Sequence, residues 1–97
     1  MKTTKEYIEL LRTYYQNNAD KYGIARMGIF GSVARGEQSS DSDIDIVYEG
    51  EANILIRSRI KQELEALFDC KVDVIRLRKA LHDSLFGDTI SKDIIYV

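Results

Sequence analysis

Apolar residues at helical spacing mark the first element of the chain, Thr4–Tyr22. They fall at positions i, i+3, i+4 and i+7, which is the spacing of an amphipathic helix that buries one face. The apolar stripe consists of Tyr7, Leu10, Leu11 and Tyr14, with Tyr15 beside it. Gly23 follows directly, and glycine commonly ends helices because it adopts a left-handed backbone conformation without strain. The pattern predicts one long helix that stops at Gly23.

A second helical pattern covers Asn53–Phe68 and separates two segments that resemble strands. Its apolar positions again share one helical face, and they are Ile56, Ile60, Leu64, Leu67 and Phe68. A helix of this length suits a right-handed crossover between parallel strands of one sheet. We therefore expect the strands on either side of it to lie parallel and close together.

Three short segments have strand patterns. Ile24–Phe30 is largely apolar, Asp43–Val47 alternates between polar and apolar residues, and Lys71–Ile75 has β-branched residues around one aspartate. The loop between the first two segments is short, which predicts that they are antiparallel neighbours. Together the elements predict an α/β (α+β) fold in which a small mixed sheet of three or more strands is flanked by helices. We expect residues 1–97 to form a single domain.

The last part of the chain, Arg78–Val97, is predicted to form a turn and a final helix. Gly87 separates the two, and Asp88 is a candidate N-cap for the helix.

Composition narrows the class of protein. The chain has 97 residues, of which 44% are hydrophobic and 31% charged, as expected of a soluble globular protein. Its net charge of −2 provides no broad basic field, so we expect no binding of long nucleic acids. Cys70 is the only cysteine, which excludes an internal disulfide. No segment has the character of a signal peptide or a membrane span, and we expect a cytoplasmic protein.

Gly31 and Ser32 form a candidate phosphate cradle after the first strand. Glycine allows a sharp turn and a close approach of the backbone to a ligand. If Ser32 caps a helical turn over Val33–Glu37, the first backbone N–H groups of that turn are available to a phosphate. Arg35 is a candidate guanidinium for the same anion. A Gly-Ser pair by itself is equally compatible with a plain turn.

Asp43 and Asp45 form a candidate metal site. Residues i and i+2 of a strand share a face, so the two carboxylates are expected to project together with Cα atoms roughly 6.5–7 Å apart. Adjacent carboxylates repel each other, and Mg²⁺ relieves that repulsion while also binding phosphate oxygens. The alternative is a solvated acidic strand end.

Asp73 is a candidate third carboxylate, because it interrupts an otherwise apolar strand. The parallel crossover is expected to place it beside Asp43 and Asp45, where it can bind a second metal ion or take the proton of an attacking hydroxyl. The alternative is an edge-strand charge that prevents aggregation. The pair upstream favours the functional interpretation.

These residues resemble the polymerase-beta-type nucleotidyltransferase superfamily, whose pattern is a Gly-Ser pair, a loop, Asp-x-Asp and a later aspartate on a neighbouring strand. Gly31, Ser32, Asp43, Asp45 and Asp73 match it in order. The fuller sequence is similar to the minimal nucleotidyltransferases (MNT, or MntA-like proteins). The resemblance implies transfer of a nucleoside monophosphate from a nucleoside triphosphate, with Mg²⁺ as the metal. It also implies a role as the antitoxin of a HEPN-type toxin. The absence of proline over residues 77–83 departs from many relatives.

Three functions remain open from the sequence. The first is Mg²⁺-dependent transfer of AMP from ATP to a hydroxyl on a partner protein, with two metal ions. The second is a binding antitoxin that acts without catalysis, and the third is a small-molecule nucleotidyltransferase that needs a partner subunit. Several basic residues either contact the triphosphate or an acidic partner, or only solvate the surface; they are Arg57, Arg59, Lys61, Arg76 and Arg78.

Overall fold

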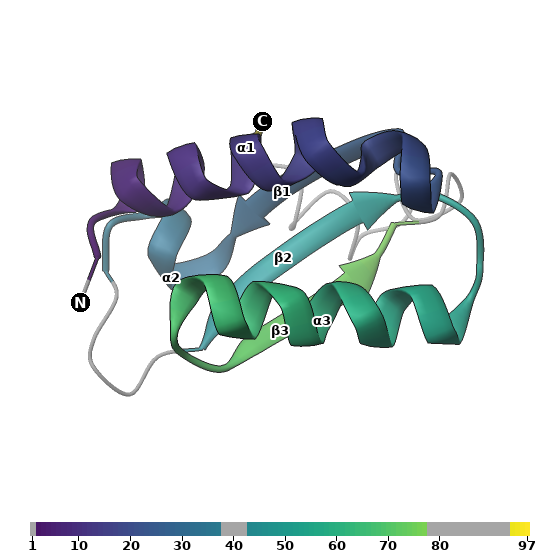
Figure 1. Ribbon diagram of the computed structural model, residues 1–97. Coiled ribbons are helices and arrows are strands. Elements are labelled where there is room, and N and C mark those ends of the chain that lie inside the picture. The colour runs from purple at the N-terminus through teal and green to yellow at the C-terminus, as the bar shows by residue number, and fades with distance from the viewer. Residues whose placement is uncertain (1, 38–42, 78–93) are drawn as a thin grey trace.

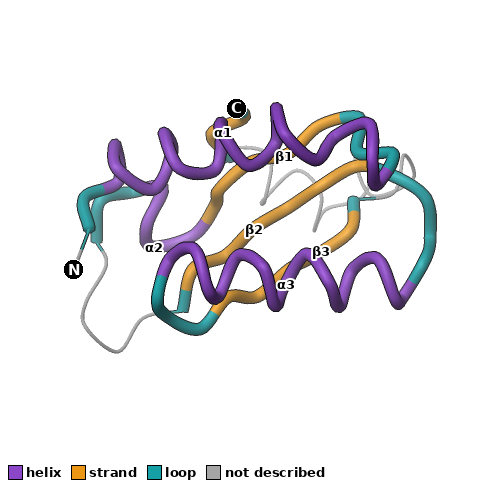
Figure 2. The backbone as a smooth tube through the Cα atoms, viewed as in Figure 1, coloured by secondary structure: helices purple, strands orange, loops and turns teal. Residues whose placement is uncertain are grey.

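The computed structural model describes residues 2–37, 43–77 and 94–97. The elements in chain order are α1 (Thr4–Tyr22), β1 (Arg26–Phe30), α2 (Gly31–Ala34), β2 (Ile44–Glu49), α3 (Ile54–Phe68), β3 (Val72–Arg76) and β4 (Ile95–Tyr96). The strands form a four-stranded sheet in the order β3-β2-β1-β4. Helices α1 and α3 pack over the sheet, and α2 is a short turn of helix at the end of β1 (Figures 1 and 2). This mixed α+β architecture confirms the predicted fold class.

Helix α1 has the predicted bounds because both of its ends carry local signals. The Thr3 hydroxyl accepts a hydrogen bond from the Glu6 backbone N–H at 3.2 Å, and the Glu6 carboxylate accepts one from the Thr3 N–H at 3.0 Å. This reciprocal capping box satisfies two N–H groups that the helix itself leaves unpaired. Gly23 ends the helix with φ +65°, a left-handed conformation that favours glycine.

Helix α3 begins one residue after the predicted start, because Asn53 is its N-cap. The Asn53 side chain accepts hydrogen bonds from the backbone N–H groups of Leu55 and Ile56. The predicted buried face is correct at Ile60, Leu64 and Phe68, and Ile56 is partly buried against the same core. It is wrong at Leu67, whose 36% exposure reflects its rotation by about 100° from Phe68 around the helix.

The sheet confirms the predicted pairings of the first three strands. Strand β1 pairs antiparallel with β2, and β2 pairs parallel with β3. Helix α3 is the crossover between the parallel pair, and it packs against the sheet together with α1 (Figure 1). The main core lies between these helices and one sheet face. From β2 that face contributes Ile44, Ile46 and Tyr48, while Val47 belongs to a smaller cluster that also contains Leu77.

Strand β4 corrects the predicted final helix, which was expected to run toward Val97. Instead, Ile95 pairs with Ile29 and Tyr96 pairs with Gly28 on β1. The β-branched and aromatic residues at this end suit a strand, and the free edge of β1 supplies the hydrogen bonds. The predicted turn at Gly87 and N-cap at Asp88 lie outside the described residues.

Within the described residues, no helix is both long enough and apolar enough to cross a lipid bilayer.

Candidate active site

Asp45 and Asp73 lie side by side on neighbouring strands. They are direct partners in the parallel β2–β3 register, an arrangement that separates Cα atoms by about 4.8 Å. Because side chains alternate along a strand, both project from the face opposite Ile44 and Ile46, which are buried against the helices. The crossover through α3 therefore brings together two carboxylates that are far apart in the sequence, as predicted.

Asp43 precedes β2 and is exposed. Its charge and that of Asp73 both act on Asp45, which is partly buried. Burial is the main cause that raises the pKa of Asp45, followed by the negative charges of Asp73 and Asp43, whereas Arg35 lowers it. The charges of Asp73, Asp43 and Arg35 therefore all lie within electrostatic reach of the Asp45 carboxylate.

The Gly31 backbone lies directly against the Asp45 carboxylate. This glycine has φ +75°, and a Cβ atom built on it would overlap Oδ2 of Asp45. Any other residue at position 31 would therefore incur backbone strain and also displace the Asp45 carboxylate. The predicted requirement for glycine thus has a second cause that the sequence did not reveal, which is contact with a candidate metal ligand.

Ser32 is placed differently from the prediction. Phe30, in an extended conformation, occupies the N-cap position of α2, and no side chain caps the helix. Helix α2 spans Gly31–Ala34 rather than the predicted Val33–Glu37, so Ser32 lies inside its first turn. The positive φ of Gly31 lets the chain turn directly out of β1, which starts the helix before the serine can act as its cap. Backbone N–H groups in a first turn have no partner within the helix.

Two contacts hold this turn in place. The Thr4 hydroxyl of α1 donates a hydrogen bond of 2.6 Å to the Val33 carbonyl oxygen, and the Val33 side chain is buried. Arg35 ends α2 and forms an ion pair of 3.1 Å with Glu37. The Arg35 guanidinium, whose charge acts on Asp45, is thus also engaged by a neighbouring acid.

The carboxylate oxygens suit a hard cation. Mg²⁺ prefers such ligands, and it would offset the repulsion that contributes to the raised pKa of Asp45. Over residues 2–37, 43–77 and 94–97, no group of three or more His, Cys, Asp or Glu side chains is arranged to hold a metal ion. The donor chemistry of the carboxylates fits Mg²⁺, whereas the described side chains do not form a three-carboxylate site as they stand.

Comparisons with known proteins identify the family of this chain. The family model described as a nucleotidyltransferase domain matches residues 11–97. A provisionally named protein adenylyltransferase of Methanocaldococcus jannaschii, MJ1379, is 38% identical over 101 residues that cover 100% of both chains. The protein adenylyltransferase MntA of Thermococcus cleftensis is 29% identical over 99 residues, which cover 100% of this chain and 98% of MntA.

Solved structures show the same fold. One, provisionally described as a minimal nucleotidyltransferase, is 30% identical with a TM-score of 0.67, and the match covers 91% of this chain and 93% of that one. Another contains a tri-AMPylated HEPN toxin of Shewanella oneidensis in complex with an MNT antitoxin. It matches with a TM-score of 0.68 at 20% identity, over 97% of this chain and 71% of that one. The chain therefore belongs to the nucleotidyltransferase family. Within it, the chain is of the minimal, MNT-like type.

Proposed function

We propose that this nucleotidyltransferase moves AMP from ATP to a hydroxyl group on a partner protein. The observation that carries the proposal is the paired register of Asp45 and Asp73, with Gly31 packed against the Asp45 carboxylate. The names of the protein adenylyltransferase relatives support AMP as the transferred group.

Two groups of residues would bind the triphosphate: the aspartates through metal ions, and the Gly31–Ser32 turn directly. Asp43, Asp45 and Asp73 would hold Mg²⁺, as two ions, which when bound neutralise the charge of the triphosphate and leaving pyrophosphate. Backbone N–H groups at Gly31 and Ser32, with the Ser32 hydroxyl, hold the outer phosphates, and Arg35 adds a positive charge. Their main contribution is to position the reacting groups.

Asp73 is the candidate base because it is exposed, whereas Asp45 is partly buried beneath Gly31. It accepts the proton of the acceptor hydroxyl, whose oxygen forms a bond to the α-phosphorus. The bond from the α-phosphorus to the oxygen bridging to the β-phosphorus breaks. Pyrophosphate leaves with that electron pair.

The proposed acceptor is a HEPN-type toxin, and the chain is its antitoxin. This rests on the solved complex of an AMPylated HEPN toxin with an MNT antitoxin of the same fold. We further propose that residues 1–97 act as one domain in the cytoplasm, on a protein acceptor rather than a long nucleic acid, since the net charge is −2.

Label transfer from α-labelled ATP with Mg²⁺ into proteins of a host lysate tests the proposal. We expect the wild type and the control Asp20→Asn, an exposed change on α1, to label one protein band, and Asp43→Asn to label none. Mass spectrometry of the band identifies the acceptor. If Asp43→Asn labels as well as the wild type, the carboxylate mechanism is wrong. If toxin neutralisation survives both Asp43→Asn and omission of ATP, the chain acts as a binding antitoxin.

A further inference from the structure

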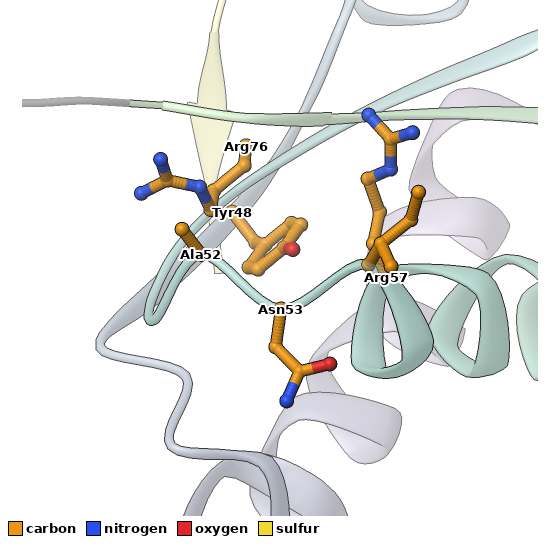
Figure 3. Close-up of a pocket in the computed structure, with 6 residues that line it drawn as sticks. Tyr48, Ala52, Asn53, Arg57 and Arg76 are labelled. Atoms are coloured by element: carbon orange, nitrogen blue, oxygen red, sulfur yellow. The ribbon is translucent and has the colours of Figure 1, made fainter.

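A pocket lies at the end of the parallel strands that is remote from the aspartates. It has a volume of about 260 Å³ and lies where β2 and β3 end and α3 begins. Figure 3 shows the Tyr48 ring among the lining side chains, with Arg76 on one side and Arg57 on the other. The lining residues are Tyr48, Ala52, Asn53, Ile54, Arg57 and Arg76, and none of these six is acidic.

Tyr48 brings an unpaired hydroxyl group to this pocket. The residue is only 2% exposed, and its hydroxyl oxygen is buried without a hydrogen-bond partner in the part of the chain that the structure describes. A buried polar group without a partner destabilises a fold, so it calls for a specific explanation. Burial raises the pKa of Tyr48, against the opposing effect of Arg76 and then Arg57. The phenol therefore keeps its proton at neutral pH and is a hydrogen-bond donor.

Two guanidinium groups accompany this donor. Arg76 is the direct partner of Tyr48 in the β2–β3 register, and its Nη1 donates one hydrogen bond of 3.2 Å to the Gly50 carbonyl oxygen. A guanidinium has five N–H donors, which leaves others for a ligand. Arg57 lies in the first turn of α3 and is exposed. The pocket also includes Asn53 and Ile54 at the start of α3, where the helix dipole is positive.

This pocket is separate from the candidate active site. Tyr48 and Arg76 share the face of the sheet that the helices cover, whereas Asp45 and Asp73 project from the opposite face. Tyr48 is also three positions further along β2 than Asp45, which corresponds to about 10 Å of extended strand. A ligand here would not occupy the site at the aspartates.

We propose that this pocket binds the phosphate group of a small molecule. Phosphate presents several acceptor oxygens and a charge near −2, which matches one phenol donor and two guanidinium groups. The Tyr48 hydroxyl is covered in the free protein, so the ligand reaches it when the exposed Arg57 side chain or the ring shifts, and it then gives the hydroxyl the partner it lacks. Ile54, which is 71% exposed, adds an apolar edge that a phosphate ester can contact and inorganic phosphate cannot.

Thermal unfolding with increasing inorganic phosphate, compared with sodium chloride at equal ionic strength, tests the site. EDTA excludes metal-dependent binding at the aspartates. We expect phosphate to raise the melting temperature of the wild type. Both Tyr48→Phe and Arg57→Gln should weaken the apparent affinity about tenfold, since each removes a hydrogen bond to a charged group. Arg59→Gln is the matched control, because Arg59 is an exposed arginine two residues along α3 that does not line this pocket.

The unliganded variants give a second measurement. Tyr48→Phe should melt no lower than the wild type without phosphate, because it removes a buried group that has no partner. If phosphate stabilises all four proteins equally beyond the sodium chloride reference, it binds elsewhere, as at the Gly31–Ser32 turn, and the site is wrong. If glutamate binds as tightly as phosphate at equal ionic strength, the pocket takes carboxylates and the phosphate assignment is wrong.

AMP in place of inorganic phosphate distinguishes the sources of the group. Tighter binding of AMP that depends on Tyr48 and Arg57 indicates a phosphate ester. Equal binding with the same dependence indicates free phosphate. AMP binding that is insensitive to Tyr48→Phe and Arg57→Gln indicates a different location, and together with unchanged phosphate binding it contradicts the proposal.

Discussion

The two ends of strand β2 have opposite chemistry. One end carries Asp45 beside Asp73, on the face away from the helices, and repulsion between these acids contributes to the raised pKa of Asp45. The other carries Tyr48 beside Arg76, on the helix-covered face, with a buried donor that lacks a partner. Alternation of side chains along a strand lets one segment of six residues serve two sites that differ in face, charge and solvent access. Each end therefore has an unfavourable feature that a ligand would relieve. A cation would offset the repulsion between the carboxylates, and an anion would accept the hydrogen bond of the Tyr48 hydroxyl.

The largest expected effect comes from removing a charge at the acidic end of β2. We predict that Asp45→Asn lowers the rate of AMP transfer at least about 100-fold, because loss of a charged group that positions and neutralises the triphosphate typically costs that much. The same change should leave the free energy of unfolding unchanged or slightly higher, because it removes a repelled, partly buried carboxylate. Label transfer and urea unfolding measure the two effects. Loss of activity through unfolding would contradict the prediction.

The next effect separates backbone strain from contact with the acid. Gly31 and Gly36 both have positive φ, at +75° and +72°, but a Cβ atom at Gly36 meets nothing within 4 Å. We predict that either glycine-to-alanine change destabilises the fold by about 1–2 kcal/mol through its left-handed backbone. Only Gly31→Ala should also displace the Asp45 carboxylate, and it should lower transfer by about tenfold or more beyond Gly36→Ala. Equal activities of the two variants would show that the Gly31–Asp45 contact is unimportant.

A smaller effect compares partnered and unpartnered phenols. The Tyr14 hydroxyl donates a hydrogen bond of 2.7 Å to the Glu63 carboxylate, which also accepts one of 3.0 Å from Tyr22. We predict that Tyr14→Phe lowers the free energy of unfolding by about 1–2 kcal/mol. Tyr48→Phe should not lower it, because Tyr48 has no bond to lose within the described residues. Urea unfolding of both variants measures the contrast, and equal losses would mean that the Tyr48 hydroxyl has a partner in the free protein.

The smallest effect tests the raised pKa of Asp45, which burial and then the charges of Asp73 and Asp43 cause. Because the pKa of Asp45 is raised in the fold, the folded protein retains this proton to higher pH than the unfolded chain does. Stability from this group is complete below the unfolded pKa of about 3.9 and declines as pH rises through the raised value. The stability of Asp45→Asn relative to wild type should therefore increase over that window and then level off. Urea unfolding at a series of pH values in EDTA measures this, with Asp20→Asn as the exposed control. A difference that does not change with pH would refute it.

Local signals made much of the architecture predictable. The i, i+3, i+4 spacing and the terminal Gly23 were sufficient for α1, because helix hydrogen bonds and caps join residues close in sequence. Alternation and segment length were sufficient for the cores of β1, β2 and β3. The prediction failed at the C-terminus, where a short apolar run is compatible with either a helix or a strand. Pairing with the free edge of β1 makes this segment the strand β4.

The sequence by itself determined which chemical groups were present and their order, including the Gly-Ser pair and the aspartates at positions 43, 45 and 73. The tertiary structure decided which of them meet. The β2–β3 register placed Asp73 beside Asp45, the turn at Gly31 brought its backbone against that carboxylate, and the start of α3 enclosed Tyr48 between two arginines. The predicted crossover already brought Asp73 near Asp45. The exact register, the Gly31 contact and the packing around Tyr48 join residues distant in sequence, so they depend on how the strands and helices pack together.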